Sequence, residues 1–254
     1  MKYDARATQS KNLLNAKPRR PFAVFDIDGT LIRWQLYHAV VGRLANAHLL
    51  GDNASQLLKE SRMKWKKREH AEAFHDYERQ LVACYEEALH TLKLADFDAI
   101  VLEVINEYKD QVYTYTRDLI SALKKQNYVL LAISGSHKEL VGAIAEYYLF
   151  DDYIGTTYER NEINFSGEKH VASYDKKSAL KSLIDKHGLS TEKSIAVGDS
   201  LSDAAMLAMV EQPIAFNPDQ KLLDKAMKNG WKIVVERKNV IYTLENHDKS
   251  YVLV

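Results

Sequence analysis

Beyond residue 113, short apolar runs alternate with longer segments whose apolar residues recur every three or four positions. The first pattern is typical of buried strands and the second of amphipathic helices. Strands that alternate with helices predict a parallel sheet covered on both faces. The predicted strands are residues 128–133, 153–159, 194–198, 213–216 and 231–235, the predicted helices are residues 116–126, 138–148, 176–188, 202–210 and 218–230, and a hairpin is expected around residues 160–167.

A further apolar segment, residues 23–25, is followed by a long stretch of different character. Residues 33–109 contain no proline and are rich in Ala, Leu, Glu, Lys and Tyr, which favours several helices. We therefore predict an α/β fold, a Rossmann-like parallel sheet with helices on both faces and an inserted all-helical cap. The tail after Val235 is typical of a polar-tipped hairpin. The predicted parts are an N-terminal arm at residues 1–20, a core at residues 21–34 and 111–254, and the cap at residues 35–110.

Composition and charge narrow the classes of function. Of the 254 residues, 46% are hydrophobic and 28% are charged, as in ordinary soluble globular proteins, and the net charge of zero does not favour nucleic acid or a membrane surface as a partner. The single cysteine, Cys84, excludes an internal disulfide and fits a reducing compartment. The first residues lack the apolar core of a signal peptide, and no stretch approaches the roughly 18 apolar residues of a membrane helix. We therefore expect a cytoplasmic protein, and its oligomeric state stays open.

Polar side chains follow three of the predicted strands. Asp26 and Asp28 come directly after the first strand, and Ser134 opens a Ser-Gly-Ser-His segment after the second. Asp199 and Asp203 lie in a Gly-Asp-Ser-Leu-Ser-Asp segment after a later strand. Because ligands of open parallel sheets bind beyond the carboxyl ends of the strands, we expect these groups to meet at one edge.

Each of these segments also has a purely structural interpretation. Asp96 and Asp98 repeat the Asp-x-Asp spacing, but no apolar strand precedes them and a helical segment follows, so they are interpreted as a helix cap. The other two polar segments would also fit helix caps if either stood alone. Capping does not explain why three such segments occur in order, each at the end of a strand, and we therefore expect a functional site.

The ordered combination resembles the haloacid dehalogenase superfamily, and within it the subfamily IB branch related to phosphoserine phosphatase. The matching motifs are Asp-Ile-Asp-Gly-Thr from Asp26, Ile-Ser-Gly-Ser around Ser134, a lysine that opens Lys-Lys-Ser-Ala-Leu, and Gly-Asp-Ser-Leu-Ser-Asp around Asp199. The Phe-Asn-Pro-Asp turn at residues 216–219 is also similar to that branch. The resemblance covers the sheet-forming residues and not the details of the cap.

The resemblance implies a phosphatase mechanism. Asp26 would attack phosphorus to form an aspartyl-phosphate, and Asp28 would protonate the leaving alcohol and then deprotonate the hydrolytic water. Ser134, the backbone amide of Gly135 and a lysine would hold the phosphoryl oxygens. The expected substrate is therefore a small-molecule phosphate ester.

The resemblance also implies a metal ion. Mg²⁺ would bind the side chains of Asp26 and Asp199 and the backbone carbonyl of Asp28, since hard cations prefer oxygen ligands. Asp203 would orient its neighbours from behind this site.

The identity of the phosphate-binding lysine has two candidates. Lys176 and Lys177 both lie about one helical turn before Leu180. The family spacing, a lysine four residues before the leucine, selects Lys176.

The predicted cap departs from the phosphoserine phosphatase pattern. Those enzymes carry a glutamate nine residues after the nucleophile, where it pairs with the substrate amine, whereas this chain has Gln35. Gln35 stays a predicted substrate contact, but its neutral amide does not favour free phosphoserine as the main substrate. The basic residues between 59 and 68 fit a solvated helix face, or one of them, Arg62 or Arg68, reaches an acidic group of the substrate. Of the nine histidines, His137 lies nearest to the predicted site.

Several functions remain compatible with these motifs. The leading hypothesis is a Mg²⁺-dependent phosphomonoesterase that hydrolyses a small phosphorylated metabolite. A phosphoserine phosphatase proper, or a phosphotransferase or mutase, would use the same intermediate. A phosphate-dependent binding or regulatory protein is the alternative from another class, but pure binding would not need both Asp26 and Asp28.

Overall fold

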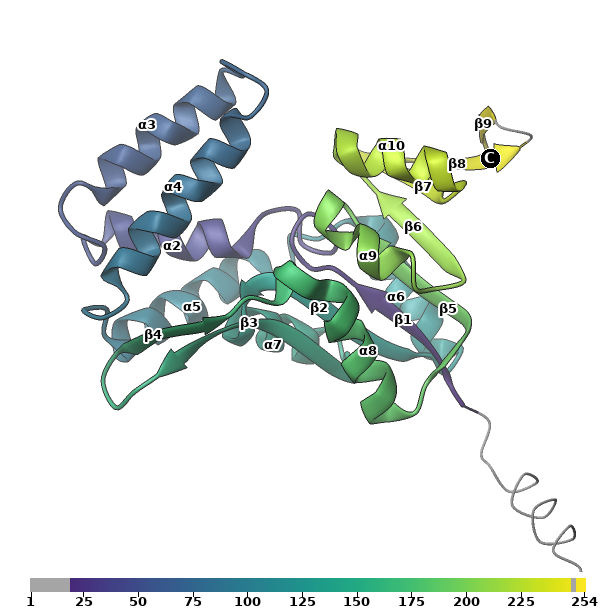
Figure 1. Cartoon of the computed structure of the whole chain (residues 1–254), viewed down its shortest axis with the longest axis horizontal. Helices are drawn as coiled ribbons and strands as arrows, with labels where there is room; N and C mark the ends of the chain where they lie inside the picture. Colours follow the sequence, from purple (N-terminus) through teal and green to yellow (C-terminus); the bar gives the residue numbers. More distant parts are fainter. Residues whose placement is uncertain (1–18, 248–249) are drawn as a thin grey trace, which may run out of the picture.

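The computed structural model describes residues 19–247 and 250–254. Within these residues, nine strands form one sheet in the order β4-β3-β2-β1-β5-β6-β7-β8-β9 (Figure 1). Most of the predicted N-terminal arm lies outside the described residues. The strands are β1 (Pro21–Phe25), β2 (Val129–His137), β3 (Asp152–Arg160), β4 (Phe165–His170), β5 (Ser190–Gly198), β6 (Gln212–Phe216), β7 (Lys232–Arg237), β8 (Val240–His247) and β9 (Ser250–Leu253).

The centre of the sheet is parallel and its margins are antiparallel. The six central strands run parallel to one another, in the order β3-β2-β1-β5-β6-β7. This parallel centre confirms the predicted fold class. Strand β4 pairs antiparallel with β3, as the hairpin expected there predicts. Strands β8 and β9 extend the other side by two antiparallel pairings, so the tail forms the expected hairpin.

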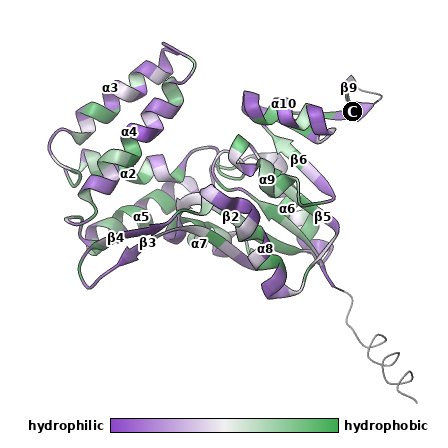
Figure 2. Ribbon diagram, in the orientation of Figure 1, coloured by the Kyte–Doolittle hydropathy of each residue, from purple (hydrophilic) through white to green (hydrophobic). Residues whose placement is uncertain are grey.

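Helices cover both faces of the sheet because alternate residues of its strands point to opposite sides. Ala23 and Phe25 face one apolar cluster, whereas Phe22 and Val24 face the other. The helices carry apolar residues toward these clusters and polar residues toward solvent (Figure 2). The helices are α2 (Leu36–Asn46), α3 (Ala54–Lys66), α4 (Ala73–Ala88), α5 (Leu94–Tyr108), α6 (Thr114–Lys125), α7 (Lys138–Tyr147), α8 (Lys176–His187), α9 (Ala204–Leu207) and α10 (Gln220–Asn229), with short 3-10 turns η1 (Ala172–Asp175) and η2 (Leu201–Asp203).

Helices α2 to α5 follow one another between β1 and β2 and occupy one end of the molecule (Figure 1). Their buried side chains, such as Leu44, Tyr85 and Phe97, join the same apolar cluster as Phe25 of the sheet. The predicted cap therefore shares one continuous core with a face of the sheet. None of the helices in the described ranges is both long enough and apolar enough to cross a membrane.

The β3-β4 hairpin ties these helices to the sheet. The backbone N–H of Leu94, at the start of α5, donates to the carbonyl of Ile163 in the hairpin turn at 2.8 Å. Arg160 of β3 forms a two-pronged contact with Asp98 of α5, at 3.0 and 2.7 Å, and also reaches Glu139 of α7. The helices are thus held against the sheet close to the ends of β2 and β3.

Three local expectations are corrected. Strand β2 runs through His137, four residues beyond the predicted end at residue 133, so the Ser-Gly-Ser-His segment belongs to the strand and does not follow it. The helix expected over residues 202–210 is shorter, with η2 leading into α9. Asp96 lies in the first turn of α5, but the residue at the N-cap is Lys93 and no side chain caps the helix.

Candidate active site

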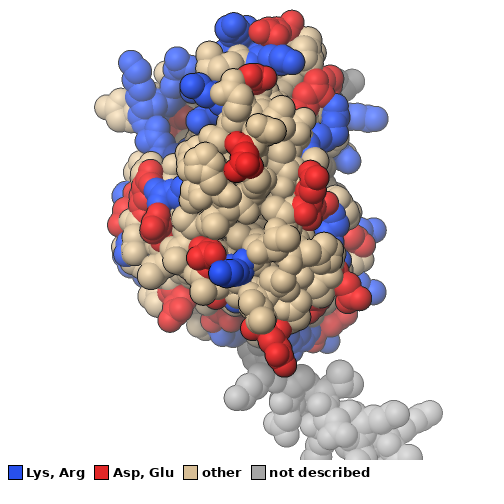
Figure 3. Space-filling model, turned by 90° about the vertical axis from the view of Figure 1, so that its left-hand side faces the viewer, with Lys and Arg blue, Asp and Glu red and all other residues tan. Residues whose placement is uncertain are grey.

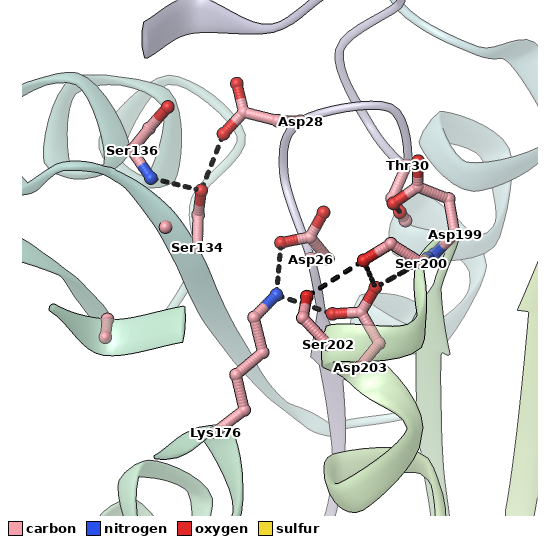
Figure 4. A network of polar contacts seen from close by, with 12 residues as sticks. Asp26, Asp28, Thr30, Ser134, Ser136, Lys176, Asp199, Ser200, Ser202 and Asp203 are labelled. Atoms are coloured by element: carbon pink, nitrogen blue, oxygen red, sulfur yellow. Dashed lines mark hydrogen bonds and ion pairs between the residues drawn. The ribbon is translucent and has the colours of Figure 1, made fainter. Parts of the chain in front are cut away.

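Strand β1 lies between β2 and β5, where the strand order reverses along the chain. Phe25 pairs in register with Ala132 of β2 and with Val197 of β5. Asp26, the next residue, therefore emerges between the ends of both neighbours, at the switch point where open α/β sheets bind ligands. Ser134 projects from β2 on one side of it and Asp199 follows β5 on the other (Figure 4).

Lys176 is the cation at the centre of the site. Its Nζ donates to Oδ1 of Asp26 at 2.7 Å and to Oδ1 of Asp203 at 2.5 Å (Figure 4). The side chain is almost fully buried because Lys176 is the first residue of α8, which places it under the strand ends. Lys177, the alternative candidate, is exposed.

Asp28 is held by two donors, one from β2 and one from the start of α2. Ser134 Oγ donates to its Oδ2 at 2.6 Å, and the backbone N–H of Leu36 donates to its Oδ1 at 2.5 Å. Leu36 opens α2, so the first turn of the predicted cap directly contacts this carboxylate. Gln35 immediately precedes that turn, at the N-cap, and its side chain does not cap the helix.

The backbone around Asp199 is shaped for a close approach to β1. Thr30 Oγ1 donates to Oδ1 of Asp199 at 3.3 Å. Gly29 has φ = +79°, and a Cβ there would collide with the Asp199 carboxylate, so only glycine fits. Asp203 accepts bonds from the backbone N–H groups of Asp199 and Ser200 at 3.1 and 3.0 Å, which fixes the loop that carries Asp199.

The Phe-Asn-Pro-Asp turn supports the same loop from outside. Asp219 caps α10 by accepting from the N–H of Leu222 at 2.6 Å, and its backbone N–H donates to the carbonyl of Asp199 at 2.8 Å. Its second carboxylate oxygen accepts from the N–H of Leu201 at 3.1 Å. This turn is therefore structural, and it positions the Asp199 loop.

The site carries more negative than positive charge. Burial raises the pKa of Asp26 from 3.8 to about 8; the ammonium of Lys176 opposes this shift, and the charges of Asp203 and Asp28 add to it. Burial, followed by the charge of Asp26, also raises the pKa of Asp199 well above its usual value. Burial alone would lower the pKa of Lys176, but Asp203 and Asp26 raise it, so the ammonium stays protonated. Carboxylates that are this crowded and desolvated favour an additional cation.

The carboxylates fit a divalent metal ion. Among the described residues, Asp26, Asp199 and Asp203 each offer an oxygen within 4.8 Å of the others. Lys176 and two backbone amides already engage Asp203. Asp26 and Asp199 thus keep the freer oxygens, and an all-oxygen donor set of this kind suits Mg²⁺.

The basic residues of the predicted cap divide into two groups. Most of them are exposed and lie on α3 or just after its C-terminal end. Figure 3 shows the end of the molecule that carries these helices, with Lys and Arg side chains on its upper part. Arg62 differs, because its Nε is buried without a hydrogen-bond partner and its guanidinium lies 5.4 Å from the centroid of Trp34. Arg62 makes no ion pair within the described ranges, whereas Arg68 is exposed.

Three contacting residues were not singled out from the sequence. Thr30 and Ser136 belong to the quoted motifs, but their spacing does not indicate their partners. Thr30 Oγ1 donates to Asp199, and Ser136 Oγ accepts from the N–H of Tyr37 at 3.0 Å. Ser200 forms a capping box with Asp203, and the Ser-x-x-Asp pattern could have indicated it.

His137 gives this region a pH-dependent stability. Burial, with a smaller contribution from Arg160, lowers its pKa from 6.5 to about 3. Below pH 6.5 the imidazole of His137 therefore binds a proton in the unfolded chain but not in the folded chain. Stability falls as the pH drops from 6.5 toward 3. We expect protonation of His137 in the unfolded chain to lower the free energy of unfolding by about 2 kcal/mol when the pH drops from 7 to 5.

The measurement is urea unfolding at both pH values. The loss between pH 7 and pH 5 should shrink in His137→Asn by that amount and stay unchanged in His48→Asn, an exposed control with positive φ that asparagine tolerates. An equal loss in His137→Asn and the unaltered chain would contradict the prediction.

Comparison with known proteins places the chain among phosphatases and their relatives. Phosphoserine phosphatase SerB1 of Mycobacterium tuberculosis is 28% identical over 144 residues, which are 55% of this chain and 47% of that protein. A phosphoserine phosphatase of Archaeoglobus fulgidus is 24% identical over 208 residues, which are 80% of this chain and 54% of that protein. The matched segment spans about half the length of each of these relatives.

Solved structures share the fold. A protein of unknown function from Bordetella pertussis superposes with a TM-score of 0.67 at 19% identity, covering 85% of this chain and 98% of that one. A phospho-aspartyl intermediate analogue of phosphoserine phosphatase superposes with a TM-score of 0.61 at 19% identity, covering 87% and 96%. The family model for haloacid dehalogenase-like hydrolases matches residues 23–208, most of the chain. The chain therefore belongs to the haloacid dehalogenase-like hydrolase family, as its four motifs predict.

Proposed function

We propose that the protein is a Mg²⁺-dependent phosphomonoesterase that hydrolyses a small phosphorylated metabolite through an aspartyl-phosphate. The observation that carries this proposal is the setting of Asp26. It stands at the end of the central strand, bonded to Lys176 at 2.7 Å and beside the carboxylates of Asp28 and Asp199. A nucleophilic carboxylate, a fixed cation and a second acid at one strand end are the parts that phosphoryl transfer needs.

In the first step, a carboxylate oxygen of Asp26 forms a bond to phosphorus as the ester P–O bond breaks. Asp28 gives its proton to the departing alcohol oxygen, which is the role of a general acid. Ser134 Oγ, the N–H of Gly135 and the ammonium of Lys176 hold the phosphoryl oxygens and offset their charge.

In the second step, water attacks the phosphorus of the aspartyl-phosphate and Asp28 accepts its proton. The P–O bond to Asp26 breaks, inorganic phosphate leaves, and both carboxylates return to their starting states. Mg²⁺, held by Asp26, Asp199 and the backbone carbonyl of Asp28, would neutralise charge shared by the nucleophile and the phosphoryl group. Asp203 keeps Lys176 and the Asp199 loop in place through its bonds to the Lys176 ammonium, to the N–H groups of Asp199 and Ser200 and to the Ser200 hydroxyl.

The predicted cap, residues 35–110, would cover this site and contact the substrate. Arg62 is the cap residue best suited to an acidic group of the substrate, because its partly buried guanidinium has no ion-pair partner in the described chain. Gln35 lies where the chain leaves the core, next to the N–H that holds Asp28.

Phosphoserine itself is the second candidate substrate, since several relatives carry the name phosphoserine phosphatase. Gln35 argues against it, because an amide gives no charge-assisted bond to the substrate ammonium. Such a bond is worth about 1.5–3 kcal/mol, so phosphoserine should fall roughly ten- to a hundredfold behind the best substrate.

Gln35→Glu tests this difference. We expect it to raise kcat/KM for phosphoserine about tenfold relative to a phosphate ester without an amine, because the carboxylate restores the charge pairing. Gln126→Glu, at the exposed end of α6, is the control and should leave the ratio unchanged. An unaltered protein that prefers phosphoserine outright would show that Gln35 does not disfavour the amine.

The direct test of the function is phosphate release from a panel of phosphorylated metabolites in the presence of Mg²⁺. Hydrolysis of at least one ester, lost on substitution of Asp26, would support the proposal. Turnover that rises with added alcohol acceptors while free phosphate does not would instead identify a phosphotransferase. Binding of phosphate esters without any turnover would indicate the binding-protein alternative.

A further inference from the structure

An aromatic nest joins the end of β2 to helices α2, α4 and α5. Its centre is the imidazole of His137, which is completely buried and has no hydrogen-bond partner for either ring nitrogen among the described residues. Tyr37 of α2 stacks on this ring, with centroids 5.1 Å apart and planes only 9° from parallel. The rings that close the nest from other sides are Tyr85 at 5.0 Å, Phe97 at 5.0 Å and Tyr158 at 4.7 Å.

Tyr37 is fixed by three independent contacts with the core. Its ring stacks on His137, its hydroxyl lies 3.3 Å from the hydroxyl of Tyr158 in β3, and its backbone N–H donates to Ser136 Oγ at 3.0 Å. A stack of this kind stabilises the pair beyond the effect of the apolar area that it buries. Together these contacts set the position of the first turn of α2.

That first turn also holds Asp28. The N–H of Leu36, the residue before Tyr37, donates to Oδ1 of Asp28 at 2.5 Å. The N-terminal amides of a helix normally need a capping side chain, yet Gln35 at the N-cap provides none. Asp28 and Ser136 take that role from the core, so any shift of α2 moves one of the two donors that orient Asp28, while Ser134 keeps the other in place.

We propose that Tyr37 and His137 are positioning residues for Asp28, a stacked pair that locks the first turn of α2 in the place where its amide aims this carboxylate. The inference rests on the acid role proposed for Asp28 above. Neither ring touches the reacting atoms. Their loss therefore weakens protonation of the leaving group, while the attack by Asp26 continues.

The leaving group distinguishes this role from a general structural one. An alkyl phosphate needs a well-placed acid, whereas p-nitrophenyl phosphate departs with little protonation. We expect Tyr37→Leu to lower kcat/KM, which reports the steps up to release of the alcohol and not the later hydrolysis, about tenfold for glycerol phosphate and less than twofold for p-nitrophenyl phosphate. Asp28→Asn should show the same selectivity with a larger amplitude.

Two conservative variants in the same nest refine the test. Tyr37→Phe keeps the stack and loses only the contact with Tyr158, so a selective loss of about threefold is expected. Tyr85→Phe removes a buried hydroxyl that has no hydrogen-bond partner among the residues that the structure describes, so both substrates should react at the unaltered rate. If Tyr37→Leu fails to fold, Tyr37→Phe carries the test alone.

Hydrogen exchange supplies a readout that does not depend on activity. The amides of Leu36 and Tyr37 should exchange at least about tenfold faster in Tyr37→Leu, while those of α10 stay protected. Unchanged exchange rates at these two amides would overturn the inference. So would an equal loss of activity toward both substrates in a folded Tyr37 variant. A protein that hydrolyses no ester, or an Asp28→Asn variant without leaving-group selectivity, would instead refute the proposed function. The exchange result would then decide whether the Tyr37–His137 pair holds the first turn of α2.

Discussion

Asp26→Asn should abolish turnover of p-nitrophenyl phosphate, by a factor on the order of 10⁴ or more. The amide cannot form the acyl-phosphate, and Asp203, the other carboxylate beside Lys176, is held by two backbone amides of the Asp199 loop. The fold should persist, because the substitution removes one of several crowded carboxylates and Lys176 keeps its bond to Asp203. Steady-state kinetics and the melting temperature of the same preparation test both statements.

The chain offers a matched control in its second Asp-x-Asp segment. Asp96→Asn makes the same chemical change in the first turn of α5, far along the sequence from the strand ends, and it should leave turnover unchanged. Turnover in folded Asp26→Asn at the unaltered rate would remove Asp26 as the nucleophile. Equal losses in both variants would mean that the effect is not specific to the site.

Removal of divalent metal should also abolish activity. A chelator leaves the buried carboxylates of the site with Lys176 as their counter-charge, and burial together with the neighbouring carboxylates raises the pKa values of Asp26 and Asp199. Mg²⁺ should restore turnover, whereas Ca²⁺ should substitute poorly because its larger and looser coordination disfavours in-line transfer. Phosphate release in chelator, in Mg²⁺ and in Ca²⁺ is the measurement.

Thermal unfolding tests the metal site independently of turnover. Mg²⁺ at 100 times its Kd should raise the free energy of unfolding by about 2.7 kcal/mol. Asp199→Asn should lose most of this gain, and Asp52→Asn, an exposed substitution in the predicted cap, should keep it. Full activity in chelator, or an equal gain in Asp199→Asn, would refute a metal site built on Asp199.

Much of the fold could be predicted because burial is encoded locally. The apolar runs at residues 129–133 and 195–197 are buried strands of the sheet, and the segments with helical spacing form α6, α7, α8 and α10. The boundaries were less predictable where tertiary contacts decide them. The predicted strand ended at residue 133, but β2 continues to His137, whose ring packs against aromatic residues of the cap helices.

The candidate site shows the same division. The motifs alone predict that Asp26, Ser134 and Asp199 lie at one edge, because parallel strands share their carboxyl ends. Sequence spacing left Lys176 and Lys177 as alternatives, since both lie in the first turn of α8. The path of that helix beneath β1 buries Lys176 against Asp26 and leaves Lys177 exposed.

By itself, the sequence determined the fold class, the family and the residue types at the strand ends, because periodicity and ordered motifs depend only on near neighbours along the chain. Only the tertiary structure decided which partners meet across large separations. Tyr37 stacks on His137, 100 positions later in the chain, and its backbone N–H donates to Ser136 Oγ, 99 positions later. No local pattern marks these pairs, since each side chain finds its partner only after α2 has packed against the end of β2.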